Sequence, residues 1–165
     1  MNKTGVFYGS TTGNTESAAK AIAKALEADC IAVDGNTPAK MADYDVVVLG
    51  SSTWGLGDLQ DDWDAVVDSL PGLDLSGKAV AFFGTGDQES YSDTFVDAMG
   101  ILKEKLSGTG ARFIGAWPTA GYEYEISASE EDGAFVGLAL DEDNQSGDTA
   151  ARIAAWTDQL KREIG

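Results

Sequence analysis

The fold is decided by the stretch Gly5-Val6-Phe7-Tyr8-Gly9-Ser10-Thr11-Thr12-Gly13-Asn14-Thr15-Glu16. Its first residues form a continuous apolar run, which is typical of a strand that is covered on both faces. The turn rich in hydroxyl groups that follows leads into an apolar stripe at helical spacing, formed by Ala18, Ala19, Ile22, Ala23 and Leu26. A buried strand, a tight turn and an amphipathic helix in this order predict the first unit of a parallel α/β sheet.

The same alternation continues along the chain. Continuous apolar runs predict further strands at 30–33, 46–49, 79–83 and 113–117. Amphipathic stripes predict helices at 59–70, 95–106 and 153–164, whereas 38–42 offers little more than one turn. We therefore expect one α/β domain over residues 1–165, with a doubly wound, five-stranded parallel sheet of order 2-1-3-4-5 and right-handed crossovers.

One long interruption separates the last predicted strand from its continuation. After Trp117-Pro118, the segment 119–134 carries no strand or helix pattern, and 135–140 then reads as strand again. Long loops without secondary structure are uncommon in compact domains and often functional. We interpret the segment as an insertion that splits the last strand, and it serves either as a docking surface or as a brace.

The composition excludes several kinds of catalysis. The chain has no histidine and a single cysteine, Cys30, so Ser-His-Asp and Cys-His catalysis, imidazole metal sites and an internal disulfide are all ruled out. No apolar run approaches the ~18 residues that a membrane helix needs, and no secretory signal is visible. These features predict a cytoplasmic protein in a reducing compartment.

The negative charge is regional. The formal net charge is −17, and 18 of the 28 acidic residues fall in four segments without lysine or arginine, at 58–68, 87–97, 123–132 and 141–148. Such a surface repels nucleic acid and anionic membranes and attracts basic proteins. The alternative is that the acid only keeps a small domain soluble.

The first of three unusual loops follows the first predicted strand. Residues Ser10–Glu16 offer hydroxyl groups, one glycine and the amides of a helix N-terminus, which together form a cradle for an anion. The loop has no lysine or arginine, and it matches neither a Walker A loop nor Gly-x-Gly-x-x-Gly. Taken alone, it also fits an ordinary helix cap.

Two aromatic loops complete the predicted site. Trp54 lies in a glycine-flanked loop after the third strand, and Tyr91 follows the glycine-rich turn after the fourth strand. An exposed indole wastes its apolar area unless something stacks on it, whereas Trp63, Trp117 and Trp156 fit core positions. Because the predicted order places strands one, three and four side by side, these loops converge. The combination predicts a planar ligand with a phosphate tail between Trp54 and Tyr91.

At these loops the sequence resembles the flavodoxins. The residues Ser10–Thr15 resemble the family's FMN phosphate signature, and Thr53-Trp54-Gly55-Leu56-Gly57 and Gly84-Thr85-Gly86-Asp87-Gln88-x-x-Tyr91 resemble its two flavin-flanking loops. The segments 117–122 and 137–145 resemble the region peculiar to the long-chain subgroup. The resemblance covers about residues 3–164 and implies a flavodoxin-like fold and a monomeric, low-potential one-electron carrier. Such a carrier binds FMN non-covalently and uses its semiquinone/hydroquinone couple to shuttle electrons between basic redox proteins, a reductase donor and an acceptor enzyme.

The resemblance also implies residue roles. Residues 10–15 hold the phosphate, Trp54 and Tyr91 stack on opposite faces of the flavin ring, Asp87 and nearby backbone meet its pyrimidine edge, and Asp143 lies near the ribityl chain. The peptide after Gly55 turns over on one-electron reduction, so that its carbonyl accepts a hydrogen bond from flavin N5–H. The cofactor-binding set is Ser10, Thr11, Thr12, Gly13, Asn14, Thr15, Ser52, Thr53, Trp54, Gly55, Leu56, Gly57, Thr85, Gly86, Asp87, Tyr91 and Asp143.

Three other classes of protein share parts of this pattern. A phosphoacceptor receiver domain needs an acidic pair, a central aspartate and a lysine at strand ends, and none is placed so here. A small FMN-dependent NAD(P)H or quinone reductase is the main alternative, although it usually shows an added substrate element or an oligomer interface. A colourless module that binds a phosphosugar or nucleotide is the third alternative.

Overall fold

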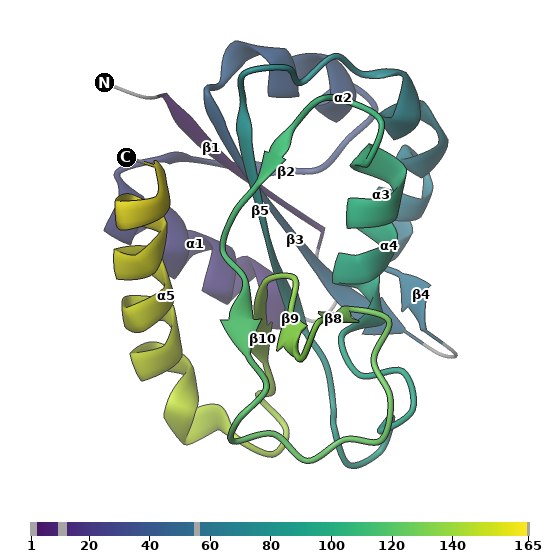
Figure 1. Cartoon of the computed structure of the whole chain (residues 1–165), viewed down its shortest axis with the longest axis vertical. Coiled ribbons are helices and arrows are strands. Elements are labelled where there is room, and N and C mark those ends of the chain that lie inside the picture. Colours follow the sequence, from purple (N-terminus) through teal and green to yellow (C-terminus); the bar gives the residue numbers. More distant parts are fainter. Residues whose placement is uncertain (1–2, 10–12, 55–56, 165) are drawn as a thin grey trace.

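A parallel sheet forms the centre of the molecule (Figure 1). The structure is a computed structural model that describes residues 3–9, 13–54 and 57–164, with only the backbone described at Trp54. The strands lie in the order β2 (Asp29–Ala32), β1 (Thr4–Gly9), β3 (Val46–Trp54) and β5 (Ala79–Thr85), followed by β6 (Arg112–Phe113) and β10 (Leu138–Leu140). Because β6 and β10 share the last position beside β5, the predicted five-position order is confirmed.

The last strand is split, as the sequence predicts. β6 pairs with the first residues of β5, Ala79 and Val80, and β10 pairs with its last residues, 83–85. Gly115 has φ +85, a left-handed conformation that turns the chain away from the sheet after Ile114. At the return point, a Cβ on Gly137 would lie 2.0 Å from the carbonyl oxygen of Phe82. Glycine is therefore required both where the insertion leaves and where it rejoins the sheet.

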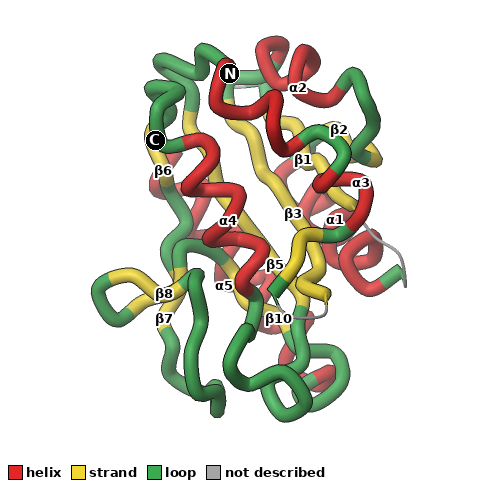
Figure 2. The backbone as a smooth tube through the Cα atoms, turned by 90° about the vertical axis from the view of Figure 1, so that its right-hand side faces the viewer, coloured by secondary structure: helices red, strands yellow, loops and turns green. Residues whose placement is uncertain are grey.

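Helices cover both faces of the sheet (Figures 1 and 2). α1 (Asn14–Leu26) and α5 (Thr149–Ile164) lie on one face, and α3 (Asp61–Asp64) and α4 (Asp97–Leu106) lie on the other. The region between β2 and β3 contains only α2 (Thr37–Lys40) and a 3₁₀ turn (Met41–Asp43), which agrees with its weak helical pattern. Trp156 and Trp63 are fully buried against opposite faces, and Trp117 is half-buried, so all three are packing residues as expected.

The helix predicted over 59–70 is wrong as a continuous element. Leu59 belongs to the short strand β4 (Asp58–Leu59), α3 has four residues, and a 3₁₀ turn follows at Val67–Gly72. The segment is rich in aspartate and β-branched valine, which are poor helix formers, and Pro71 ends it. The apolar stripe is nevertheless buried, because Trp63 and Leu70 have no exposed surface.

The insertion folds as a small antiparallel sheet. β7 (Trp117–Pro118), β9 (Ala134–Phe135) and β8 (Glu130–Glu131) pair in that order. The strand predicted over 113–117 is therefore shorter than expected, since only Phe113 of that run joins the main sheet and Trp117 pairs with Phe135 instead.

Candidate functional site

The predicted site residues that the structure describes gather at the carboxyl edge of the sheet, where β1, β3 and β5 end. Ser52 lies opposite Thr85 in the register of β3 and β5. The hydroxyl of Thr15, in the first turn of α1, is 2.9 Å from the hydroxyl of Thr85, and both side chains are buried. This bond links the first turn of α1 to the end of β5 at the sheet edge.

The N-terminus of α1 has the geometry of an anion cradle. Gly13 caps the helix with φ +95, a left-handed conformation that favours glycine. Asn14 is exposed, and the first amides of a helix have no acceptor within the helix. Lys20 pairs with Glu16, an acidic residue of the first turn, at 2.7 Å on the helix surface. Ser10, Thr11 and Thr12, also predicted as phosphate ligands, lie outside the described residues.

Both ends of the loop after β3 contact the start of α4. The hydroxyl of Thr53 accepts a hydrogen bond from the Ala98 amide at 3.0 Å. Gly57 is buried with φ +96, and a Cβ there would lie 2.8 Å from an oxygen of Asp97, so a larger residue would clash. Burial raises the pKa of the Asp97 carboxyl. The Trp54 side chain, Gly55 and Leu56 lie outside the described part of the chain, and their predicted roles stay predictions.

The loop after β5 presents the second predicted aromatic ring. Tyr91 is 50% exposed, unlike the buried phenylalanines of the core, so its ring is accessible to a ligand. Asp87 holds this loop, because its carboxylate accepts hydrogen bonds from the Ser90 and Glu89 amides at 3.0 and 3.1 Å. These bonds keep the pKa of Asp87 below its usual value. The Asp87 carboxylate therefore stabilises the turn to which it belongs. Gly86, the residue before it, is half-buried.

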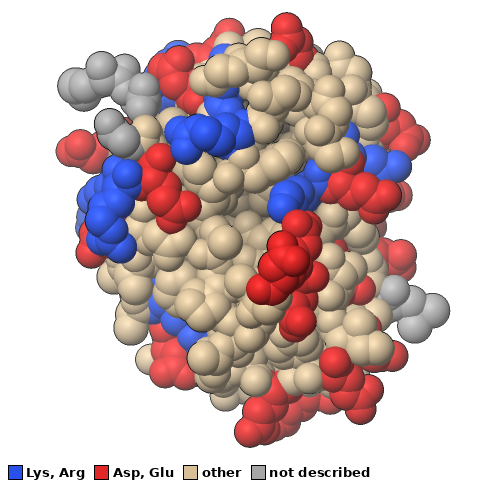
Figure 3. All heavy atoms as spheres, in the orientation of Figure 1, with Lys and Arg blue, Asp and Glu red and all other residues tan. Residues whose placement is uncertain are grey.

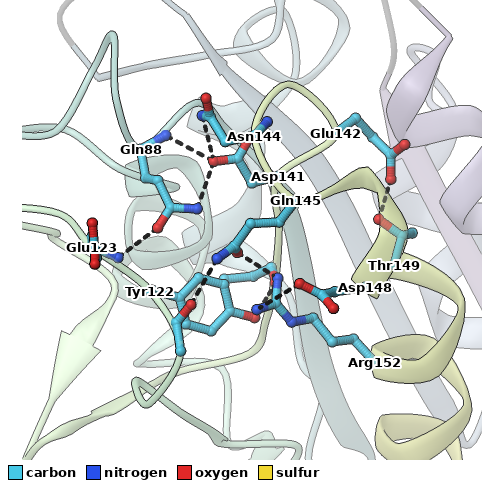
Figure 4. Close-up of polar contacts among 12 residues, drawn as sticks. Gln88, Tyr122, Glu123, Asp141, Glu142, Asn144, Gln145, Asp148, Thr149 and Arg152 are labelled. Atoms are coloured by element: carbon cyan, nitrogen blue, oxygen red, sulfur yellow. Dashed lines mark hydrogen bonds and ion pairs between the residues drawn. The ribbon is translucent and has the colours of Figure 1, made fainter.

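A buried carboxylate that the sequence analysis missed joins this loop to the one after β10 (Figure 4). One oxygen of Asp141 accepts hydrogen bonds from the Gln88 amide and side chain at 3.0 and 2.7 Å and from the Asn144 side chain at 2.9 Å. Its other oxygen accepts from the Asp143 and Asn144 amides at 3.1 and 3.0 Å. The signal available in the sequence was an aspartate placed directly after the buried run 138–140, at the same sheet edge.

Asp143 lies in the loop after β10, beside the hub around Asp141, and its predicted role near the ribityl chain stays a prediction. It is exposed, and its pKa is raised by partial burial and by the neighbouring carboxylates of Asp87, Asp141 and Glu142. Asn144 donates to both Asp87 and Asp141, at 2.8 and 2.9 Å. The loop after β10 is therefore part of the candidate site, and its carboxylates make this edge strongly negative.

The insertion braces the site from the side. Gln88 accepts from the Glu123 amide, so the buried hub also holds the insertion (Figure 4). The Tyr122 hydroxyl donates to the Ala139 carbonyl at 2.6 Å and its ring lies 4.2 Å below the Arg152 guanidinium. A cavity of about 310 Å³ lies between Gln88, Tyr122, Gln145 and their neighbours. Burial raises the pKa of Tyr122.

Acidic side chains gather near the candidate site. In Figure 3 acidic side chains are spread over the whole face, but most lysine and arginine lies in the upper half, so the lower end, where the loops at the carboxyl edge lie in Figure 1, is predominantly acidic. Within residues 3–9, 13–54 and 57–164, no group of three or more potential metal ligands is found. No helix in that part of the chain is long and apolar enough to cross a membrane.

Comparison with known proteins gives one consistent family. The family model described as Flavodoxin matches residues 6–156. A flavodoxin from Picosynechococcus sp. is 48% identical over 172 residues, covering 100% of this chain and 99% of the relative. Flavodoxin 1 of Escherichia coli is 44% identical over 168 residues, covering 99% of this chain and 96% of the relative. The crystal structure of Fusobacterium nucleatum flavodoxin bound to flavin mononucleotide superposes with a TM-score of 0.93 at 29% identity, covering 99% of both chains.

Proposed function

The chain belongs to the flavodoxin family, and from this premise we propose that it is a low-potential one-electron carrier that holds FMN at the carboxyl edge of its sheet. Flavodoxins are FMN-dependent electron carriers that serve redox partner proteins, and not enzymes, so the alternative of a small FMN-dependent NAD(P)H or quinone reductase is set aside. The FMN supplies the chemistry, the uptake and release of single electrons.

The start of α1 supports the proposed placement of the phosphate. Gly13 caps the helix in a left-handed conformation, and helix amides with nearby hydroxyl groups favour an anion without a cationic side chain. In our proposal Ser10, Thr11, Thr12, Gly13, Asn14 and Thr15 hold the phosphate. The Thr15 hydroxyl also binds Thr85, so the same residue fixes the cradle to the end of β5.

The exposed ring of Tyr91 supports the proposed placement of the flavin. It projects from a turn that is held by Asp87 and connected through Asn144 to the loop after β10. In our proposal Trp54 covers the opposite face of the flavin. Ser52, Thr53, Gly55, Leu56 and Gly57 line the flavin on one side and Thr85, Gly86 and Asp87 on the other, while Asp143 lies near the ribityl chain.

The partners follow from the charge. Acidic residues of the segments 87–97 and 141–148, among them Asp87 and Asp143, lie in the loops of the proposed site, so we infer that the donor and the acceptor present basic surfaces. The same charge opposes binding to nucleic acid and to anionic membranes. We further propose that the carrier consists of a single domain over 1–165 and works as a monomer. We place it in the cytoplasm, because the free thiol of Cys30 is stable in a reducing compartment.

Titration of the apoprotein with FMN, followed by quenching of flavin fluorescence, tests the assignment of Tyr91. Replacing Tyr91 by alanine removes a stacking face worth about 1–3 kcal/mol, which corresponds to roughly 5- to 150-fold weaker binding. The matched control Tyr91→Phe keeps the ring face and should stay within about threefold of the wild type. Unchanged affinity in Tyr91→Ala would show that the flavin lies elsewhere.

A further inference from the structure

The insertion reaches the loop that carries Tyr91. The Glu125 and Ile126 amides both donate to the Ser92 carbonyl, at 2.8 and 3.0 Å. Ser92 directly follows Tyr91 in the sequence. Residues 125 and 126 therefore lie beside the proposed flavin loop, although 34 positions or more separate them from Tyr91 along the chain.

Ile126 is an anomaly on this surface. Its side chain is 65% exposed, and among the described residues the large apolar side chains left in solvent are Tyr91 and Ile126. A single exposed isoleucine is common on proteins. This one belongs to the segment whose backbone is bonded to Ser92, the residue after the exposed Tyr91, and its neighbours Glu123, Glu125 and Asp93 are exposed carboxylates.

The backbone around Ile126 is held in place. The Ser127 hydroxyl donates to the Phe95 carbonyl, the Ala128 amide donates to the Asp97 carboxylate at 2.7 Å, and the Ser129 hydroxyl donates to the Val96 carbonyl at 2.6 Å. The isoleucine is therefore presented by a rigid segment and not by a free loop tip. Such preorganisation reduces the entropy lost when a partner binds.

We propose that Ile126 is the apolar anchor of the docking surface for redox partners, and that it fits an apolar patch surrounded by lysine or arginine on a basic redox protein. The carboxylates around it supply the charge that attracts such a partner, and the isoleucine supplies the contact that excludes water once the two proteins meet. This inference rests on the proposed electron-carrier function, and it assigns a docking role to an insertion that also acts as a brace.

The test uses the FMN-loaded full chain and cytochrome c, a basic haem protein with an accessible redox edge, as the probe. The second-order rate constant of cytochrome c reduction is measured by stopped flow over a range of ionic strength. Ile126→Ser should lower this rate constant about fivefold, because a transient complex buries only part of the isoleucine side chain. The dependence of the rate constant on salt should stay the same, because the charges are unchanged. Ile126→Leu, which keeps the apolar side chain, should react like the wild type.

Several results separate the possible failures. FMN affinity and both one-electron potentials should be the same in Ile126→Ser and in the wild type, because Ile126 does not belong to the proposed FMN site. Equal reduction rates for Ile126→Ser and the wild type would overturn the anchor. Self-association of the wild type that Ile126→Ser abolishes would assign the surface to a second copy of the chain and overturn it too. A wild-type chain that retains no FMN would instead refute the proposed function.

Discussion

The buried carboxylate of Asp141 should be the residue on which the shape of the site depends most. Its two oxygens accept five hydrogen bonds, from Gln88, Asp143 and Asn144, and it has no exposed surface. In Asp141→Asn, an NH₂ group that donates replaces one of the two oxygens that accept. Two or three of the present donors, depending on which oxygen is replaced, then lose their acceptor. Hydrogen bonds to a charged group contribute about 1.5–3 kcal/mol each, and we expect a loss of about 3–5 kcal/mol.

Urea unfolding of the apoprotein, followed by tryptophan fluorescence and far-UV circular dichroism, measures that loss. Domains of this size are stable by about 5–15 kcal/mol, so Asp141→Asn should unfold at a clearly lower urea concentration. Asp148→Asn is the matched control, because that carboxylate is 62% exposed and its ion pair with Arg152 is long at 3.9 Å. This substitution should lower the free energy of unfolding by less than about 1 kcal/mol. If Asp141→Asn cost no more than Asp148→Asn, the hub would not carry the stability assigned to it.

Two other changes should raise stability, each measured by urea unfolding. Glu27 ends α1 with φ +53, a conformation costly for a side chain, so Glu27→Gly should add about 0.5–1 kcal/mol; a loss would show that the side chain itself stabilises the helix end. The raised pKa of Asp97 means that the folded protein binds its proton more tightly than the unfolded chain, so the stability from this group is lost as pH rises through that pKa. Asp97→Asn should therefore gain stability over the wild type at pH 7 and lose that advantage below about pH 4; an advantage independent of pH would contradict this.

Most of the sheet could be predicted from the sequence because its strands are buried on both faces. The runs around Val47 and Val80 are continuously apolar, and both residues are fully buried in neighbouring strands. The split of the last strand was also visible, because apolar residues resume at 135 after the insertion. The predicted strand over 135–140 is too long, since only Leu138–Leu140 joins the main sheet and Phe135 pairs with Trp117. Apolar spacing predicted which side of 59–70 is buried but not its backbone. The burial of Trp63 requires only the right spacing, whereas a continuous helix also requires good helix formers.

The site was harder to predict where it depends on contacts between distant segments. Tyr91 and Gly13 could be proposed as site residues because an aromatic residue after a glycine-rich turn and a hydroxyl-rich turn are local signals. Asp141 was missed because its partner Gln88 lies 53 positions away, and polar residues that pair across loops leave no periodic pattern. The same limitation hid the bonds between 125–129 and 92–97, through which the insertion braces the loop after β5.

The central claim is that this chain holds FMN and passes single electrons, and a spectroelectrochemical titration of the purified, FMN-loaded protein tests it most directly. We predict two resolved one-electron steps, with the second at a more negative potential than the same step of FMN free in solution, because carboxylates crowd the edge of the site. A single two-electron step at the potential of free FMN would contradict the account.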